Sequence, residues 1–424
     1  MTFFKKLKGM DRNVWIRVIG ETITSSAMMM LMPFFALYLE GKVDSMLKVG
    51  FIMSISPIAS LFGSMAGGRL ADLYGRKRMM VFSTFGTSLI LVSFALVESY
   101  TSFLILSILL GISNSFFSPA ASAMVADVTE PEKRTEAYGL LRVGSNVGTV
   151  IGPLLGSSVV YFSKDSLFFI AATALGLYSI AQLILLKETL PAEKKSVKEN
   201  QDKTTIPFKK VMNIISSDKL LLFYVATGVI ISMGFSQIEG MLPLYFKQSF
   251  KPHFGEWNPY PFLMSLNGLL VVLFQFPISS YLSNRSIGKT MFYGTILFGL
   301  GILSIGFAPP LFLFVGLGKW MILVLLAIIF IYYTFGEMVM SPVQMTFVAN
   351  IAPEELRATY MAVGSMKYTI GGFLGPLLGG YLFDLKLGIW LFIILGTGVV
   401  ISGVMYRSLD EKVAIRDNQQ GIAQ

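Results

Sequence analysis

Long apolar runs separated by short polar connections dominate the pattern of this sequence. Each run has about 19 to 30 residues, enough for a helix to cross a hydrocarbon core of roughly 30 Å. Twelve such runs recur along the whole chain. We therefore predict an all-α integral membrane protein with twelve transmembrane helices. The predicted spans are residues 14–40, 46–67, 79–97, 101–126, 137–161, 166–186, 220–246, 261–283, 290–308, 320–349, 359–383 and 388–406.

The composition agrees with this pattern and limits the chemistry of the chain. Of the 424 residues, 54% are hydrophobic and 14% are charged, against about 25% charged residues in soluble domains. The longest polar insert, residues 187–219, is too short for a core of its own, so we expect no soluble catalytic domain. Cysteine is absent, and we place the single histidine, His253, in a loop. We therefore expect no enzyme activity and no metal site, and proton chemistry falls to carboxylates.

The basic residues are distributed unevenly along the chain. With both termini in the cytoplasm, most of the 34 Lys and Arg residues fall on the cytoplasmic side, as the positive-inside rule expects. The formal net charge of +9 is thus explained by topology, and a nucleic-acid partner has no separate support. The first apolar run is too long for a signal-peptide core, so we predict that it is retained as the first helix.

An internal repeat divides the chain into two halves. The segment SPAASAMVADVTEPEKRTEAYGLLRVGSNVGTVIGPLLG from Ser118 aligns without gaps with SPVQMTFVANIAPEELRATYMAVGSMKYTIGGFLGPLLG from Ser341. This match places helices 4 and 5 over helices 10 and 11, so the halves share one topology. We predict a six-helix half at residues 1–186, a cytoplasmic linker at 187–219, a second six-helix half at 220–406 and a cytoplasmic tail at 407–424.

A further motif, GRLADLYGRKR, lies between predicted helices 2 and 3 at residues 68–78. With the parallel repeats and the linker, it resembles the major facilitator superfamily over essentially the whole chain. The resemblance implies a gating loop formed by Gly68, Asp72, Gly75, Arg76 and Lys77. In that family the acid holds the cytoplasmic ends of helices from the two halves together and releases them during transport. From the residues alone, the basic side chains should face the cytoplasm and anionic headgroups, and a simple positive-inside anchor is the alternative.

A glycine and proline pattern lies in predicted helix 5, where Gly148, Gly152, Pro153 and Gly156 belong to the sequence GTVIGPLLG. The glycines allow another helix to pack closely, and the proline kinks the helix. The pattern resembles a motif of antiporters in this family that export their substrates. Simple helix packing is the alternative, and the second copy in helix 11 weakens the inference about direction.

Six ionisable residues stand well inside the predicted spans, where a charge costs about 2.5–3.5 kcal/mol and usually marks function. They are Arg17 and Glu21 in helix 1, Arg142 in helix 5, Glu239 in helix 7, Glu337 in helix 10 and Lys367 in helix 11. The first two are four residues apart and can form a local pair. The other two acids have no base within a helical turn, and an isolated carboxylate in an apolar setting can take up and release protons. Constitutive pairing remains the structural alternative, with Glu337–Lys367 and Glu239–Arg142 as the candidate pairs.

The segments FGEMVMSP and IEGMLPLYF around the two lone acids resemble those of multidrug:proton antiporters in the superfamily. The resemblance implies that Glu337 and Glu239 take part in drug and proton handling. We predict a secondary active transporter that exports lipophilic small molecules in exchange for protons by alternating access. Its expected partners are a small lipophilic substrate, which can be cationic, protons and membrane lipids. We expect a monomer in a bacterial cell membrane, driven by the proton gradient without a cofactor. The alternatives are a same-fold exporter of a specific glycolipid, sugar or metabolite, and a non-transporting receptor or scaffold.

Overall fold

The computed structural model describes residues 10–130, 133–160, 163–190, 214, 216–255, 257–282, 285–353, 356–413 and 415. Most of the predicted linker and the end of the predicted tail lie outside this described part. The described residues form helices and short connections, without a strand. The helices of the first half are α2 (Arg12–Glu40), α3 (Met46–Tyr74), α4 (Arg76–Leu96), α5 (Tyr100–Val128), α6 (Arg134–Val160) and α7 (Lys164–Leu185). Those of the second half are α10 (Lys219–Glu239), α11 (Leu242–Phe254), α12 (Tyr260–Leu282), α13 (Ile287–Val315), α14 (Lys319–Ile351), α15 (Arg357–Asp384) and α16 (Gly388–Tyr406).

The predicted all-α membrane fold is confirmed. Among the described residues, eleven helices are long and apolar enough to cross a membrane, so the chain is a multi-pass membrane protein. The twelfth long helix, α15, has 28 residues but is less apolar. It contains six glycines and Lys367, which lower its mean hydropathy.

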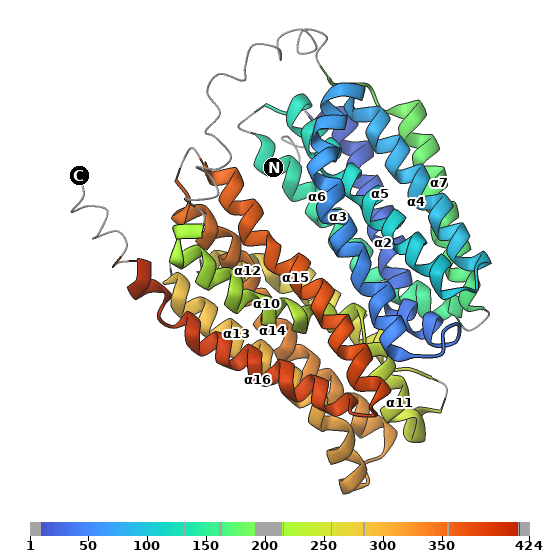
Figure 1. Ribbon diagram of the computed structural model, residues 1–424, viewed down its shortest axis with the longest axis vertical. Coiled ribbons are helices and arrows are strands. Elements are labelled where there is room, and N and C mark those ends of the chain that lie inside the picture. The colour runs from blue at the N-terminus through green and yellow to red at the C-terminus, as the bar shows by residue number, and fades with distance from the viewer. Residues whose placement is uncertain are drawn as a thin grey trace. The chain divides into compact units, whose positions relative to one another are not determined.

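The chain divides into two compact units that repeat one packing scheme. Unit 1 comprises Met1–Asp44 and Phe51–Thr205, and unit 2 comprises Ser45–Gly50 and Ile206–Gln424. In unit 1, α2 packs on α6, and α4 packs on α5 and α7. In unit 2, the corresponding helices form the same pairs, α10 on α15 and α13 on α14 and α16. Figure 1 colours the helices of unit 1 from blue to green and those of unit 2 from yellow-green to red.

The predicted span 220–246 is wrong as a single helix. It breaks after Glu239, where Gly240 ends α10, and resumes as α11. A continuous helix would need the amide of residue 243 to donate to the carbonyl of Glu239, but Pro243 has no N–H and instead lies in the first turn of α11, where proline is tolerated. The helix then continues to Phe254, so His253 lies in its last turn rather than in a loop.

The predicted gating loop is also mostly helical. Gly68 and Asp72 lie in the last two turns of α3, and Arg76 is the first residue of α4. Gly75 alone separates the two helices, with a φ of 105° that only glycine adopts readily. The turn therefore holds the motif's acid and its arginine one helical turn apart along the chain.

The first turn of α3 belongs to unit 2, where a carboxylate caps it. Asp384, at the end of α15, accepts hydrogen bonds from the Ser45 hydroxyl at 2.5 Å, the Met46 amide at 2.6 Å and the Leu47 amide at 3.1 Å. A negative charge at a helix N-terminus is favourable because the first amides lack helical partners. The start of α3 is thereby fixed to the end of α15.

Candidate functional site

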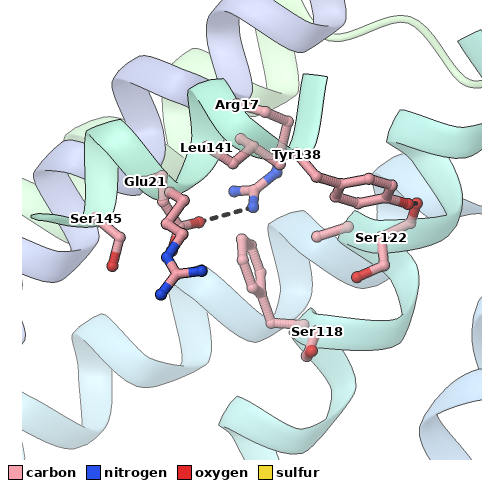
Figure 2. Close-up of a pocket in the computed structure, with 10 residues that line it drawn as sticks. Arg17, Glu21, Ser118, Ser122, Tyr138, Leu141 and Ser145 are labelled. Atoms are coloured by element: carbon pink, nitrogen blue, oxygen red, sulfur yellow. Dashed lines mark hydrogen bonds and ion pairs between the residues drawn. The ribbon is translucent and has the colours of Figure 1, made fainter. Parts of the chain in front are cut away.

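A cavity of about 400 Å³ lies in unit 1 between α2, α5 and α6. Three of the six predicted intramembrane charges line it, together with hydroxyl, aromatic and aliphatic side chains. Figure 2 shows the Arg17 guanidinium directed into this cavity and joined to Glu21 by a dashed line. The lining residues are Arg17, Glu21, Phe117, Ser118, Ala121, Ser122, Tyr138, Leu141, Arg142 and Ser145.

Arg17 and Glu21 form the local pair that their spacing predicts. An Arg17 Nη atom lies 2.8 Å from a Glu21 carboxylate oxygen. Arg17 is 4% exposed, and its other Nη atom donates to the Tyr178 hydroxyl at 3.3 Å. The guanidinium carbon lies 4.8 Å from the centre of the Phe117 ring, within range of a cation–π interaction. Its Nε atom is buried and hydrogen-bonds with none of the described residues.

Arg142 is placed differently from Arg17 although both line the same cavity. Its side chain is exposed and makes no ion pair or hydrogen bond with the described residues of unit 1. It shares a face of α6 with Tyr138 and Ser145, four residues before it and three after it. The cavity therefore presents a guanidinium whose charge none of the described groups of unit 1 neutralises.

Glu337 in α14 belongs to a polar cluster in unit 2. The amide nitrogen of Asn267 in α12 donates to its carboxylate at 3.1 Å and also to the Thr334 hydroxyl at 2.9 Å. Thr334 in turn donates to the carbonyl of Phe330 at 2.6 Å. Glu337 is half-buried and has no ion pair among the described residues. Its partners are thus neutral, and the sequence-based alternative of a pair with Lys367 is wrong.

Glu239 lies at the break between α10 and α11 and makes no hydrogen bond or ion pair within the described part of unit 2. The neighbouring hydroxyl of Tyr260 donates to the carbonyl of Ile238. Tyr260 and Tyr333 both interact electrostatically with Glu239, and Tyr333 does so with Glu337 as well. The Tyr333 hydroxyl is buried and bonds none of the described residues. The two carboxylates and the two phenols therefore belong to one cluster.

Lys367 forms a separate buried cluster in unit 2 and is 2% exposed. Its Nζ donates to the Tyr224 hydroxyl at 2.6 Å and to the side-chain oxygen of Gln344. The same nitrogen lies 4.2 Å from the Tyr224 ring centre and 4.9 Å from that of Tyr368. Tyr224 lies 143 residues away along the chain, so sequence reasoning did not find this contact. Lys367 is thus held by aromatic rings and neutral oxygens without a carboxylate.

The acid and arginine of the motif between α3 and α4 contact one another. Arg76 donates to Asp72 at 2.5 Å and to Asp127 at 3.5 Å. Arg76 is 8% exposed, which contradicts the expectation that it faces lipid headgroups. The reason is that two carboxylates satisfy its charge inside unit 1. Lys77 is half-buried, and Gly68 has open space where a side chain would lie.

Sequence reasoning missed Glu188, which falls in the predicted linker. Its carboxylate accepts from the amides of Arg76 at 2.8 Å and Lys77 at 3.2 Å and so caps α4. Unit 2 repeats this device, because Asp410 accepts from the Gly288 amide at 2.8 Å at the start of α13. The available signal was an acid three or four residues after the last helix of each half.

The glycines of the helix 5 motif pack α6 against α2. A side chain on Gly148 would come within 2.5 Å of Ser25 Cβ, and one on Gly152 within 2.7 Å of Met29 Cβ. A side chain on Gly156 would come within 2.6 Å of the carbonyl oxygen of Met30. The matching glycines of α15 press on α10 in the same way. The motif is therefore a packing position shared by both units, and Pro153 lies inside the same helix.

The described residues contain no group of three or more His, Cys, Asp or Glu side chains placed to hold a metal ion.

The chain is similar to a known protein family and to several of its members. The family model of the Major Facilitator Superfamily matches residues 18–376 and again residues 257–421. A Na(+), Li(+), K(+)/H(+) antiporter of Planococcus maritimus is 29% identical over 423 residues, which cover 95% of this chain and 96% of that protein. The multidrug resistance protein MdtG of Rahnella sp. is 31% identical over 244 residues, 56% of this chain and 57% of that protein.

Solved structures share the fold at low sequence identity. A peptide transporter, POT, superimposes with a TM-score of 0.77 at 16% identity, covering 96% of this chain and 95% of that chain. The nucleoside transporter NupG gives a TM-score of 0.77 at 15% identity, covering 94% of this chain and 99% of that chain. These similar proteins are transporters rather than enzymes. The chain belongs to the Major Facilitator Superfamily.

Proposed function

We propose that this transporter exports lipophilic small molecules in exchange for protons, by alternating access, and that Glu337 carries the exchanged proton. The observation that supports the proposal is the neutral environment of a carboxylate inside the membrane. Asn267 donates one hydrogen bond to Glu337, and no basic side chain in the described part of unit 2 pairs with it. The named relatives include an antiporter and a multidrug resistance protein, which supports the same class.

The partner of Glu337 matters because it determines whether a proton can bind. A lysine at hydrogen-bond distance would hold the carboxylate ionised. Protonation of the carboxylate would then leave the lysine without a charged partner. The amide of Asn267 can donate to either protonation state, since a neutral acid keeps an acceptor oxygen. Glu239, which also lacks a basic partner among the residues of unit 2 that the structure describes, is the second candidate in the same cluster.

The energy available to such an exchange is sufficient for concentrative export. A membrane potential of 100 mV supplies about 2.3 kcal/mol per charge moved. A difference of one pH unit adds about 1.4 kcal/mol per proton.

We propose that the gate is the motif at α3 and α4, in which Asp72 and Arg76 contact one another. We also propose that both termini are cytoplasmic.

Proton flux in proteoliposomes tests the proposal. Purified protein is reconstituted with a pH-sensitive dye inside, and lipophilic dyes are added one at a time. We expect substrate-dependent proton movement in the native protein and its loss in Glu337→Gln, which preserves the side-chain shape and the contact with Asn267. Glu98→Gln is the control, because Glu98 is an exposed acid whose side chain is 83% accessible. Native flux in Glu337→Gln would refute the role of Glu337.

Exchange of monovalent cations for protons is the second candidate. It is favoured by the relative from Planococcus maritimus, whose name describes such an antiporter and whose similarity spans nearly the whole chain. The cluster around Glu337 also offers carboxylate, amide and hydroxyl oxygens, the ligand type that hard cations prefer. The same proteoliposomes decide between the two. Proton movement driven by NaCl, LiCl or KCl without any organic compound would favour cation exchange over export of lipophilic molecules.

A further inference from the structure

We infer that the cavity of unit 1 binds an anionic group, a carboxylate or a phosphate, carried by the transported molecule, and that Arg142 is its main contact. The inference rests on the proposed export function and adds the substrate class, a lipophilic molecule with an acidic group. Unit 2 would handle the proton through its carboxylates.

The charges that line the cavity do not balance. Two guanidinium groups and one carboxylate face it. The carboxylate of Glu21 is already bonded to Arg17 at 2.8 Å. Among the described residues of unit 1, Arg142 has no partner, and neither does the buried Nε of Arg17. The cavity thus has donors and one positive charge to offer and no uncommitted acid for a cation.

The donors are of the type that recognises acidic groups. A guanidinium is planar and can donate two parallel hydrogen bonds to a carboxylate or a phosphate. The hydroxyls of Ser118 and Ser122 lie four residues apart on α5 and bond none of the described residues. Figure 2 shows both serines among the residues that line the same cavity as Arg17. Two further donors are therefore available to the same group.

The remaining walls suit the lipophilic part of such a molecule. Phe117, Leu141 and Ala121 contribute apolar surface, and the Arg17 guanidinium already covers part of the Phe117 ring. A volume of about 400 Å³ is within the range of sites for small molecules. Arg142 lies eight residues from the first residue of α6, about 12 Å along the helix axis. Its guanidinium is thus available well inside the helix.

Binding of a matched pair of probes tests the inference. Tritiated 1-pyrenebutyrate and its uncharged methyl ester share one aromatic group and differ in charge, and their affinities are measured by scintillation proximity on detergent-purified protein. We expect the native protein to bind the acid at least tenfold more tightly than the ester. Arg142→Gln should lose that difference, and Arg142→Lys should keep part of it. Arg12→Gln is the matched control, since Arg12 is an exposed arginine at the start of α2.

The possible results test the anion site and the proposed export function separately. Equal affinities for the two probes in the native protein, or unchanged binding of the acid in Arg142→Gln, would overturn the anion site even where proton flux occurs with other compounds. Acid binding that depends on Arg142 without proton flux would support the site and refute the export function. Displacement of the acid by phosphatidylglycerol but not by phosphatidylcholine, again dependent on Arg142, would assign the anionic group to a lipid headgroup.

Discussion

The pair formed by Arg17 and Glu21 gives a quantitative test of the unit 1 site. Replacing Glu21 with leucine leaves the guanidinium of Arg17 buried beside apolar groups. Replacing Arg17 with methionine leaves a carboxylate whose side chain is 27% exposed and can contact water in the cavity. Changing both residues removes the two charges together. The three variants form a double-mutant cycle that measures the coupling between the side chains.

The expected free energies follow from the burial of each partner. Removing one member of a buried ion pair costs about 3–5 kcal/mol. For Glu21→Leu we expect a loss of about 2–3 kcal/mol, because Arg17 keeps its hydrogen bond to Tyr178 and its contact with the Phe117 ring. For Arg17→Met we expect about 1–2 kcal/mol, since Glu21 is partly solvated. The double variant should lose no more than about 1 kcal/mol, so the coupling is at least about 2 kcal/mol.

Reversible unfolding in mixed micelles, titrated with sodium dodecyl sulfate and followed by circular dichroism, measures these free energies. Losses in the double variant that equal the sum of the single losses to within about 0.5 kcal/mol would refute the coupling. The same double variant separates stability from binding. It should fold with near-native stability yet bind 1-pyrenebutyrate more weakly, because the Arg17 guanidinium is absent from the cavity.

Three further predictions concern packing, capping and a buried charge. Gly152→Ala should lower the free energy of unfolding by about 1–3 kcal/mol because the added methyl group meets α2. Gly139→Ala, on the same helix, places its methyl group in open space and should change the free energy of unfolding little. Thermal unfolding of the two variants measures the difference. Glu188→Ala should cost about 1–2 kcal/mol and speed hydrogen exchange of the first amides of α4, and unchanged exchange would contradict its capping role. Lys367→Met should leave the melting temperature unchanged or raised while substrate-driven proton flux falls, and a large drop in melting temperature would show that the lysine is needed for folding.

Hydropathy predicted the long helices because a transmembrane run is long, local and nearly uninterrupted. It did not predict the break after Glu239, since Gly240 and Pro243 alter hydrogen bonding without making the run polar. It also ended α3 too early, because the last turns of that helix are polar. The consequence was that Asp72 was assigned to a loop and is found in a helix.

Some charged residues contact partners that are close in the sequence, and others contact partners that are far away in it. Arg17 and Glu21 are one turn apart, and their pair was predicted from spacing alone. Lys367 is held by a tyrosine 143 residues away, and Arg76 is capped by an acid 112 residues away. No local pattern contains such partners, so the sequence indicated which charges lie within the long apolar runs but not which groups they contact.

Comparing the two units separates the helix packing that they share from the ionisable residues that differ between them. In unit 1 the glycine face of α6 meets α2 at Ser25, and in unit 2 the equivalent face of α15 meets α10 at Ser232. Eight residues before each serine stand Arg17 and Tyr224, so one helix position carries a base in unit 1 and a phenol in unit 2.

The base of unit 2 comes instead from α15. A side chain on Gly228, the equivalent of Glu21, would come within 2.5 Å of the aliphatic chain of Lys367. The buried base thus lies on the first helix itself in unit 1 and against the first helix in unit 2, and among the described residues only the base of unit 1 pairs with an acid. The position of Glu337 likewise corresponds to Asn114 in unit 1. Because the packing is shared and the charges are not, symmetry of the fold cannot explain these ionisable groups.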